Sequence, residues 1–188
     1  MRLFIAVEIS EEIKAELVKI VDKLKEAKAE VKWVRPEGMH LTLKFLGEVG
    51  EERKEIVGNI LEKVSIARPF TVTFQGLGVF PNLNNPRVVW VGIEKGREEL
   101  KKINGELEKL LAEAGFPKEE REYESHLTLG RVKSGYNKAA LAKKLSAEGP
   151  LTLAPLKVEK IILMESILKR EGAEYRRVKE VYLHWKGE

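Results

Sequence analysis

The first 50 residues alternate between apolar runs and amphipathic stretches, which predicts strands and helices in turn. Residues 2–8 form an apolar run typical of a strand. Ser10 is a suitable N-cap, and the two acidic residues after it complement the helix dipole, so we expect a helix from Glu11 to about residue 28. Its apolar stripe consists of Ile13, Leu17, Ile20, Val21 and Leu24. A short strand at 31–34 and a longer strand at 39–46 follow.

The next part of the chain predicts a helix, a strand and a connection that can be interpreted in two ways. A helix is expected over 51–67, with its apolar stripe at Ile56, Ile60, Leu61 and Val64. Residues 70–74 alternate as a strand, and Gly76 and Gly78 then predict a loop. The Asn- and Pro-rich segment 80–86 is either a joint between two halves of the chain or a plain turn, and the sequence leaves both interpretations open.

The second half repeats the alternation of strands and helices. The near-continuous apolar run at 87–93 favours a strand buried on both faces. A helix at 97–114 has its stripe at Leu100, Ile103, Leu107, Leu110 and Leu111. The further expected elements are a charged, exposed segment at 118–124, a strand at about 125–132, a helix at 138–147, and two strands at 156–168 and 175–185.

A four-residue sequence, His-Leu-Thr-Leu, occurs at 40–43 and again at 126–129. Each copy lies on an expected strand, so the His and the Thr share one face while the two leucines take the other. An Arg that begins an apolar strand precedes each His, at Arg2 and Arg87, by 38 and 39 residues. The pattern predicts two similar strand-helix-strand repeats, at roughly 1–67 and 87–147, packed about a pseudo-twofold axis so that both motifs meet in one cleft.

Length and composition limit the fold and the partners. With 188 residues the chain suits one bilobal domain, 1–188, rather than two large domains. A content of 43% hydrophobic and 34% charged residues excludes a disordered chain. The net charge of +4 suits a small or local anionic ligand better than a long nucleic-acid track. The apolar run at 3–7 is too short for a signal or membrane segment, so we expect a soluble cytoplasmic protein.

The paired motifs have the composition of an acid–base site for phosphate chemistry. A neutral His accepts a proton and a protonated His donates one, so two histidines beside a phosphate can do both near neutral pH. Each Thr hydroxyl can donate a hydrogen bond to a non-bridging phosphate oxygen. Such a site needs neither a metal nor another cofactor, and the absence of Cys removes thiolate nucleophiles and Cys-ligated zinc.

Two plainer interpretations stand beside this one. A single strand His is more often held by a structural hydrogen bond, and Thr is common in strands for its β propensity alone. Two histidines can also bind zinc, but neither copy of the motif carries a carboxylate at ligand spacing. The third histidine, His184, lies outside the motifs and is expected to be structural or exposed.

The doubled motif, read as HLTLKFLGEV and SHLTLGRV, resembles the two-histidine phosphoesterase superfamily, and within it the RNA 2′,3′-cyclic phosphodiesterases, long called the 2′-5′ RNA ligase family. Supporting stretches are RLFIAVEIS, GLGVFPNLNNPRVVWVGI, and Ser166, Gly172 and Tyr175. The resemblance covers nearly the whole chain. It implies an α+β fold, bilobal with pseudo-twofold symmetry, in which two antiparallel sheets face a central cleft and the helices lie outside.

The resemblance also implies a reaction and its partners. The expected activity is hydrolysis of an RNA-terminal 2′,3′-cyclic phosphate to a 2′-phosphate by a monomer acting on RNA ends or tRNA fragments. Two alternatives stay open, namely 2′-5′ ligation of RNA ends as the physiological direction and a non-catalytic RNA- or nucleotide-binding module. Retention of both His and both Thr argues against the binding module, because binding alone requires no proton transfer.

Residue by residue, the family motif matches His40, Thr42, His126 and Thr128 as catalytic groups, with His40 as the acid and His126 as the base. Arg131 matches a substrate-binding Arg. Phe45 occupies the corresponding offset after the first motif, where its ring can stack on a base. Ser125 stands where many members have Pro.

Strict alternation creates a conflict at two positions. It places Arg131 on the face of the leucines, away from His126, unless the strand twists, ends or bulges near Gly130. A solvent-exposed Arg paired with a Glu is the alternative. Alternation also places Lys44 on the face of His40 and Thr42, although neither the motif nor the resemblance gives Lys44 a role.

Overall fold

The computed structural model describes residues 1–64 and 68–184. In chain order the elements are β1 Arg2–Glu8, α1 Glu11–Lys25, β2 Val31–Trp33, a 3-10 turn Pro36–Gly38, β3 His40–Glu48, α2 Glu51–Lys63, β4 Phe70–Val72, β5 Phe74–Asn82, β6 Asn85–Ile93, α3 Arg97–Glu113, β7 His126–Val132, α4 Lys138–Glu148, β8 Leu156–Val158, β9 Lys160–Lys169 and β10 Gly172–Tyr182. No helix in this described part is long and apolar enough to cross a membrane.

Two four-stranded antiparallel sheets form the centre of the molecule. One has the order β10-β9-β1-β3 and the other the order β5-β6-β7-β2, and a two-stranded sheet joins β4 to β8. Each motif strand therefore lies beside the first strand of its own half, β3 beside β1 and β7 beside β6. The expected α+β class with two antiparallel sheets is confirmed.

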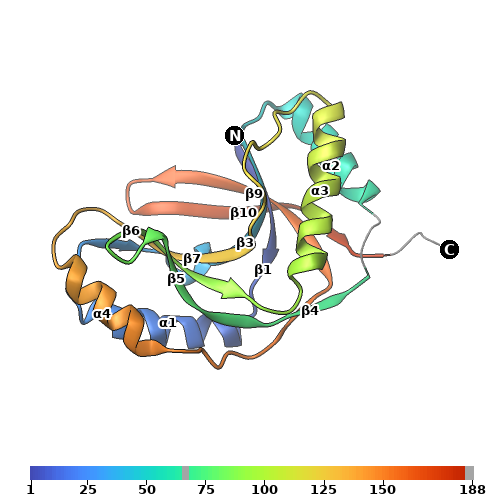
Figure 1. The fold of residues 1–188 in the computed structure, drawn as a ribbon. Coiled ribbons are helices and arrows are strands. Elements are labelled where there is room, and N and C mark those ends of the chain that lie inside the picture. Colours follow the sequence, from blue (N-terminus) through green and yellow to red (C-terminus); the bar gives the residue numbers. More distant parts are fainter. Residues whose placement is uncertain (65–67, 185–188) are drawn as a thin grey trace.

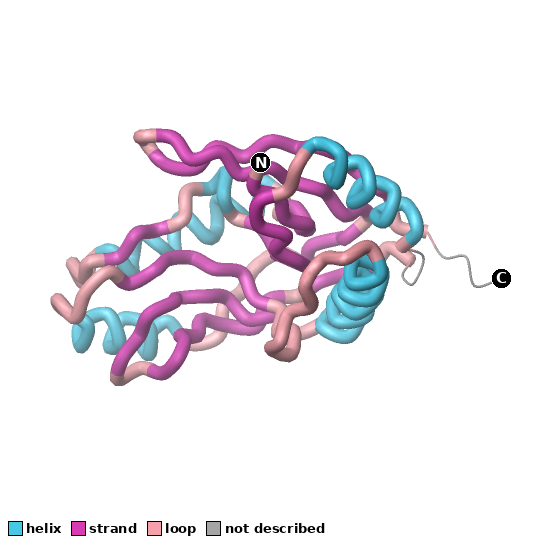
Figure 2. The backbone as a smooth tube through the Cα atoms, turned by 90° about the horizontal axis from the view of Figure 1, so that it is seen from above, coloured by secondary structure: helices cyan, strands magenta, loops and turns pink. Residues whose placement is uncertain are grey.

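The helices lie in two pairs, and each pair covers one sheet. Helices α2 and α3 contact each other, α2 contacts β9 and β10, and α3 contacts β3, whereas α1 contacts α4 and α4 contacts β5 and β6 (Figure 1). Figure 2 shows the strands between these helix pairs. Helix α3 follows β6 in the chain but packs on the other sheet. Residues from both sheets and all four helices accordingly share one continuous hydrophobic core.

The first helix follows its sequence closely. The Ser10 side chain accepts a hydrogen bond of 3.3 Å from the backbone N–H of Ile13, and α1 then buries all the residues of its expected stripe. In α2 the expectation for Ile56 is wrong, because this side chain is 42% exposed and Val57 is buried instead. Val57, Ile60, Leu61 and Val64 have the helical spacing, and Ile56 lies one position outside that stripe. The expected end of this helix, at 65–67, lies outside the described residues.

Residues 74–93 form a long β-hairpin where a loop and a possible joint were expected. Strand β5 runs through Gly76 and Gly78, and the side-chain oxygen of Asn82 accepts a 3.0 Å hydrogen bond from the backbone N–H of Asn85 across the turn. The interpretation of 80–86 as a joint between halves is therefore wrong. Gly78 allows close approach of Trp90, since a Cβ there would lie 2.3 Å from the indole Cη2 atom.

The remaining elements agree with the sequence within a few residues, with two further corrections. The strand expected at 156–168 is split into β8 and β9, because β8 pairs with β4 while β9 pairs with β1. Burial on both faces of the strand at 87–93 is wrong for Val88 and Trp90, which are half-buried. The end of the last expected strand, at Trp185, lies outside the described residues.

Candidate active site

The first motif strand carries its two polar residues on one face and then changes parity at a bulge. Leu41 and Leu43 are buried in the core, while His40 and Thr42 lie on the opposite, half-buried face. Thr42 pairs with Ala6 of β1, but the next pair is Lys44 with Ile5, so Leu43 is the extra residue.

This bulge reverses the faces of the two residues that follow it. Lys44 turns into the core, where it is 7% exposed, and Phe45 pairs with Phe4 on the face of His40. The expectation that Lys44 shares the face of His40 is therefore wrong. Phe45 is 68% exposed, and its ring lies 6.0 Å from that of Phe4, so it is available beside the motif.

The second motif strand has the same bulge at the same position. Thr128 pairs with Trp90 and Gly130 pairs with Val89, so Leu129 is the extra residue. Arg131 then pairs with Val88, which shares the face of Trp90 and hence that of His126. The conflict over Arg131 is resolved, because the bulge moves this exposed side chain onto the face of the motif.

The two motif strands contact each other although they belong to different sheets. Strands β3 and β7 are in contact, and the segment 116–125 that leads into β7 runs along the outer edge of β3 (Figure 1). The Tyr123 hydroxyl donates a 3.0 Å hydrogen bond to the carbonyl oxygen of Thr42, and the Lys44 amine donates a 2.9 Å bond to the carbonyl oxygen of Pro117. These bonds hold the segment that leads to His126 against the strand that carries His40.

Aromatic rings and charges surround His40. Its ring centroid lies 5.6 Å from that of Phe4 and 5.2 Å from that of Tyr175, both in edge-on contact. Burial, together with the positive charge of Lys14, lowers the pKa of His40 to about 4. The carboxylate of Glu8 and a backbone hydrogen bond with Gly38 act in the opposite direction, and His40 is neutral at pH 7 in the free protein.

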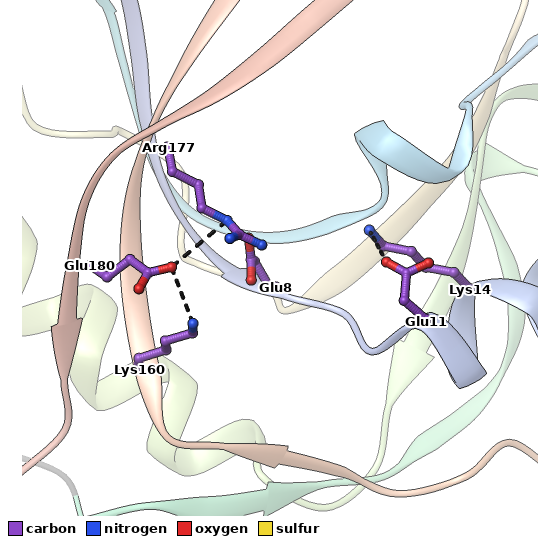
Figure 3. A network of polar contacts seen from close by, with 6 residues as sticks. All are labelled: Glu8, Glu11, Lys14, Lys160, Arg177 and Glu180. Atoms are coloured by element: carbon purple, nitrogen blue, oxygen red, sulfur yellow. Dashed lines mark hydrogen bonds and ion pairs between the residues drawn. The ribbon is translucent and has the colours of Figure 1, made fainter.

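The negative charge of Glu8 is shared between His40 and another partner. It is the register partner of His40 in β1 and forms an ion pair with Arg177 of β10. Arg177 lies 3.7 Å from Glu180, which in turn contacts Lys160 at 3.1 Å (Figure 3). The figure also shows Lys14 beside Glu11, at 3.5 Å. The charge next to His40 is thus distributed over a network of paired groups.

The second histidine has an equivalent setting. The His126 ring lies 5.3 Å from Phe80 and 6.2 Å from Trp90, and its Nδ1 atom is 2.8 Å from the carbonyl oxygen of Glu124. A carbonyl can only accept, so Nδ1 carries the proton and Nε2 of the neutral ring is the basic nitrogen. His184 makes a similar 3.2 Å contact with Tyr182 outside the motifs, so this bond alone does not identify a functional histidine.

Sequence reasoning missed the four aromatic residues beside the histidines, Phe4, Phe80, Trp90 and Tyr175, and the hydrogen bond from Tyr123 to β3. Phe80 and Trp90 were part of the expected loop and of a strand thought to be buried on both faces, and the resemblance gave Tyr175 no role. Tyr123 lies within the segment expected to be exposed, yet it is half-buried, and burial raises its pKa. A signal was present, since Tyr123 is the only aromatic residue among the charged residues 118–124.

The donors of the site suit an anion rather than a resident metal. Within residues 1–64 and 68–184, no three His, Cys, Asp or Glu side chains gather in a group that could hold a metal ion. The two hydroxyls, and Arg131 on the same face as the second motif, can instead donate hydrogen bonds to phosphate oxygens, while the imidazoles can exchange protons with a substrate.

An α+β fold with two antiparallel sheets, each carrying one His-x-Thr motif on strands that contact each other, is typical of phosphoesterases of the two-histidine type. The family model described as LigT like Phosphoesterase matches residues 7–90 and again residues 91–175. The chain belongs to this family, and the resemblance stated from the motifs is confirmed.

Individual relatives agree over nearly the whole chain. The RNA 2′,3′-cyclic phosphodiesterase of Aeropyrum pernix is 38% identical over 165 residues, which cover 88% of this chain and 93% of the relative. That of Archaeoglobus fulgidus is 37% identical, with 94% and 97% covered. Among solved structures, TT0787 of Thermus thermophilus has a TM-score of 0.79 at 28% identity, covering 99% of this chain and 100% of that one. E. coli LigT complexed with 3′-AMP has a TM-score of 0.80 at 25% identity, with 97% of both chains covered.

Proposed function

We propose that this protein hydrolyses 2′,3′-cyclic phosphodiesters at RNA ends to 2′-phosphomonoesters by metal-independent acid–base catalysis. The observation that carries the proposal is the pairing of two equivalent histidines, each followed by a Thr on the same face and each framed by two aromatic rings. The names of the relatives give the substrate class, since they are called RNA 2′,3′-cyclic phosphodiesterases.

In the proposed reaction, water attacks phosphorus from the side opposite the 3′ oxygen. One His takes a proton from the attacking water, the P–O3′ bond breaks, and the other His gives its proton to the departing 3′ oxygen. The product keeps the phosphate on the 2′ oxygen. Negative charge grows on the non-bridging oxygens, and the hydroxyls of Thr42 and Thr128 donate hydrogen bonds to them.

We assign His40 as the acid and His126 as the base. The Nδ1 contact of His126 with the Glu124 carbonyl supports the base role, because it leaves Nε2 as the proton acceptor. His40 is neutral in the free protein, with its pKa at about 4, so its acid role requires protonation on binding. An anionic phosphate beside the ring favours the protonated imidazole, so substrate binding raises the pKa of His40.

The residues on the motif faces complete the substrate contacts. Arg131 emerges on the face of His126 and Thr128, where its guanidinium can pair with phosphate oxygens. Phe45 emerges on the face of His40 and Thr42, where its exposed ring can stack on the terminal base. Both residues stand five positions after their histidines.

The cellular setting belongs to the same proposal. The substrates are RNA ends or tRNA fragments with a 2′,3′-cyclic phosphate, and the enzyme acts in the cytoplasm as a monomer. The working unit is one bilobal domain, 1–188, with its motif-bearing repeats at roughly 1–67 and 87–147. The shared hydrophobic core supports a single unit.

The test is to incubate the protein with adenosine 2′,3′-cyclic phosphate in EDTA and to identify the product by phosphorus NMR. We expect the 2′-phosphate to accumulate at the rate seen without chelator. The variants His40→Ala and His126→Ala should lose activity, while His184→Ala, which removes the one histidine outside the motifs, should keep it. Loss of activity in EDTA with rescue by a divalent ion, or formation of the 3′-phosphate, would refute the proposal.

A further inference from the structure

The two motif strands differ in what covers their outer edges. Strand β7 is flanked by β2, which pairs with it from Val31 to Trp33. Strand β3 is the outermost strand of its sheet within the described residues, and the segment 116–125 runs beside it without forming a strand. Side chains hold this segment in place, through Lys44 to Pro117 and through Tyr123 to Thr42.

This difference leaves a pocket of about 260 Å³ between the end of β3 and the start of the segment. Its lining includes Phe45, Leu46, Gly47, Phe116, Pro117 and Lys118. The Phe116 ring is fixed from behind by Arg53, whose guanidinium carbon lies 3.9 Å from the ring centroid. The buried Lys44 and the exposed Glu119 complete the lining. The pocket therefore combines an exposed aromatic ring, apolar walls, the outward backbone groups of an edge strand and two exposed side chains of opposite charge, Lys118 and Glu119.

The pocket shares Phe45 with the face that carries the first motif. The bulge in β3 places the Phe45 ring on the face of His40, and the same residue forms one wall of the pocket. A volume of this size suits one planar ring system rather than a larger ligand, for which pockets are typically about 300–1,000 Å³.

The chemistry of the substrate determines which base can reach this pocket. A 2′,3′-cyclic phosphate bridges the 2′ and 3′ oxygens of the terminal ribose. The RNA chain therefore continues from this nucleotide only through its 5′ oxygen. We propose that the pocket binds the base of the nucleotide on the 5′ side of the cyclic phosphate-bearing nucleotide. This inference rests on the proposed function, in which the terminal nucleotide lies at the two histidines.

Each wall then has a part in binding. The second base stacks on the exposed Phe45 ring, beside the apolar wall that the buried Phe116 ring forms. Edge-strand amides and carbonyls contact its polar edge, and the Lys118 ammonium faces the phosphate that links the two nucleotides. Binding of this kind discriminates RNA ends from cyclic mononucleotides, and it tolerates any base because every base offers a stacking face.

The experiment compares kcat/KM for adenosine 2′,3′-cyclic phosphate with kcat/KM for the adenine dinucleotide that ends in the same cyclic phosphate. We expect the wild-type protein to prefer the dinucleotide by about tenfold or more, as stacking of one base predicts. Leu46→Trp, which fills the pocket, and Lys118→Glu should bring this ratio close to one. Lys143→Glu makes the same charge change at an exposed position of α4 and should leave the ratio unchanged.

The outcomes separate this inference from the proposed function. Equal kcat/KM values for both substrates in the wild-type protein would overturn the pocket assignment, as would a uniform loss for both substrates in Lys118→Glu. Failure of the wild-type protein to hydrolyse either substrate would instead overturn the proposed function. If circular dichroism shows that Leu46→Trp does not fold, the ratio measured for Lys118→Glu decides the matter.

Discussion

The hydroxyl of Tyr123 donates a 3.0 Å hydrogen bond to the carbonyl oxygen of Thr42, which links the approach to the second motif with the middle of the first. Thr42 lies on the outermost strand of its sheet, so its carbonyl is free to accept a bond from outside the sheet. Tyr123 precedes His126 by three residues. This bond therefore ties the approach to His126 to the strand that carries His40.

Tyr123→Phe should lower kcat by about tenfold or more with little change in KM, because small displacements of catalytic groups reduce rate more than binding. The variant keeps the buried ring and loses only one hydrogen bond, which is worth about 1 kcal/mol of stability. Steady-state kinetics and thermal unfolding check both statements. Tyr136→Phe, at an exposed tyrosine outside the site, is the control. A normal kcat in Tyr123→Phe would show that the segment is positioned by its other contacts.

The buried ion pair between Lys44 and Glu108 should be far more important for folding than an exposed one. Its atoms are 2.8 Å apart, and the side chains are 6% and 16% exposed. Glu108→Gln leaves the Lys44 charge buried without its partner, at a cost of about 3 kcal/mol in the free energy of unfolding. Glu122→Gln breaks the exposed pair between Lys101 and Glu122, whose side chains are 53% and 75% exposed, and should change the stability far less because solvent screens this pair. Urea unfolding of both variants compares them, and equal losses would contradict the prediction.

The residues that sequence could place are those whose position follows from periodicity. The leucines of both motifs and the stripe of α1 are buried as expected, because a strand or helix of regular geometry fixes which residues share a face. The two histidines and two threonines of the proposed site follow from the repeat alone, and their role stays a prediction. Regular geometry also explains the errors, since one extra residue at Leu43 or Leu129 reverses the faces of Lys44, Phe45 and Arg131.

The environment of the site could not be predicted, because it depends on contacts between distant segments. Nothing near Phe80 or Tyr175 in the chain indicates that one lies against His126 and the other against His40. The glycines of β5 were interpreted as a loop signal, whereas Gly78 makes room for the indole of Trp90 on the neighbouring strand. Such a glycine cannot be distinguished from a loop glycine until the partner strand is known.

The lowered pKa of His40 makes a prediction for stability against pH. The pKa is about 4 in the folded protein, against 6.5 for an unperturbed His, so the unfolded chain binds a proton more readily. Folding favours the neutral form of His40. The contribution of this effect to the free energy of unfolding is complete above pH 6.5 and is lost as the pH falls towards 4. On lowering the pH from 7 to 5, the wild-type free energy of unfolding should therefore fall by about 2 kcal/mol more than that of His40→Gln. Urea titrations at the two pH values measure this difference, with His184→Gln, at an exposed histidine, as the control. Equal losses in the wild type and His40→Gln would show that His40 titrates normally.

The roles of the two histidines can be separated with a substrate whose leaving group needs no acid. In the proposed reaction His40 protonates the departing 3′ oxygen and His126 takes the proton from water. A cyclic phosphate analogue with an activated leaving group in place of the 3′ oxygen departs without a proton. It should restore activity substantially in His40→Ala and only slightly in His126→Ala, because loss of the acid is bypassed and loss of the base is not. General acid catalysis is worth about 10²–10⁴-fold, so the rescue should be of that order.

The wild-type rate on the natural substrate should show a bell-shaped dependence on pH, with apparent pKa values that belong to the coupled pair. The reverse pattern of rescue would exchange the two roles. Full activity of both variants on the natural substrate would remove the histidines from the chemistry, and the packing of Phe4, Tyr175, Phe80 and Trp90 around them would then be purely structural.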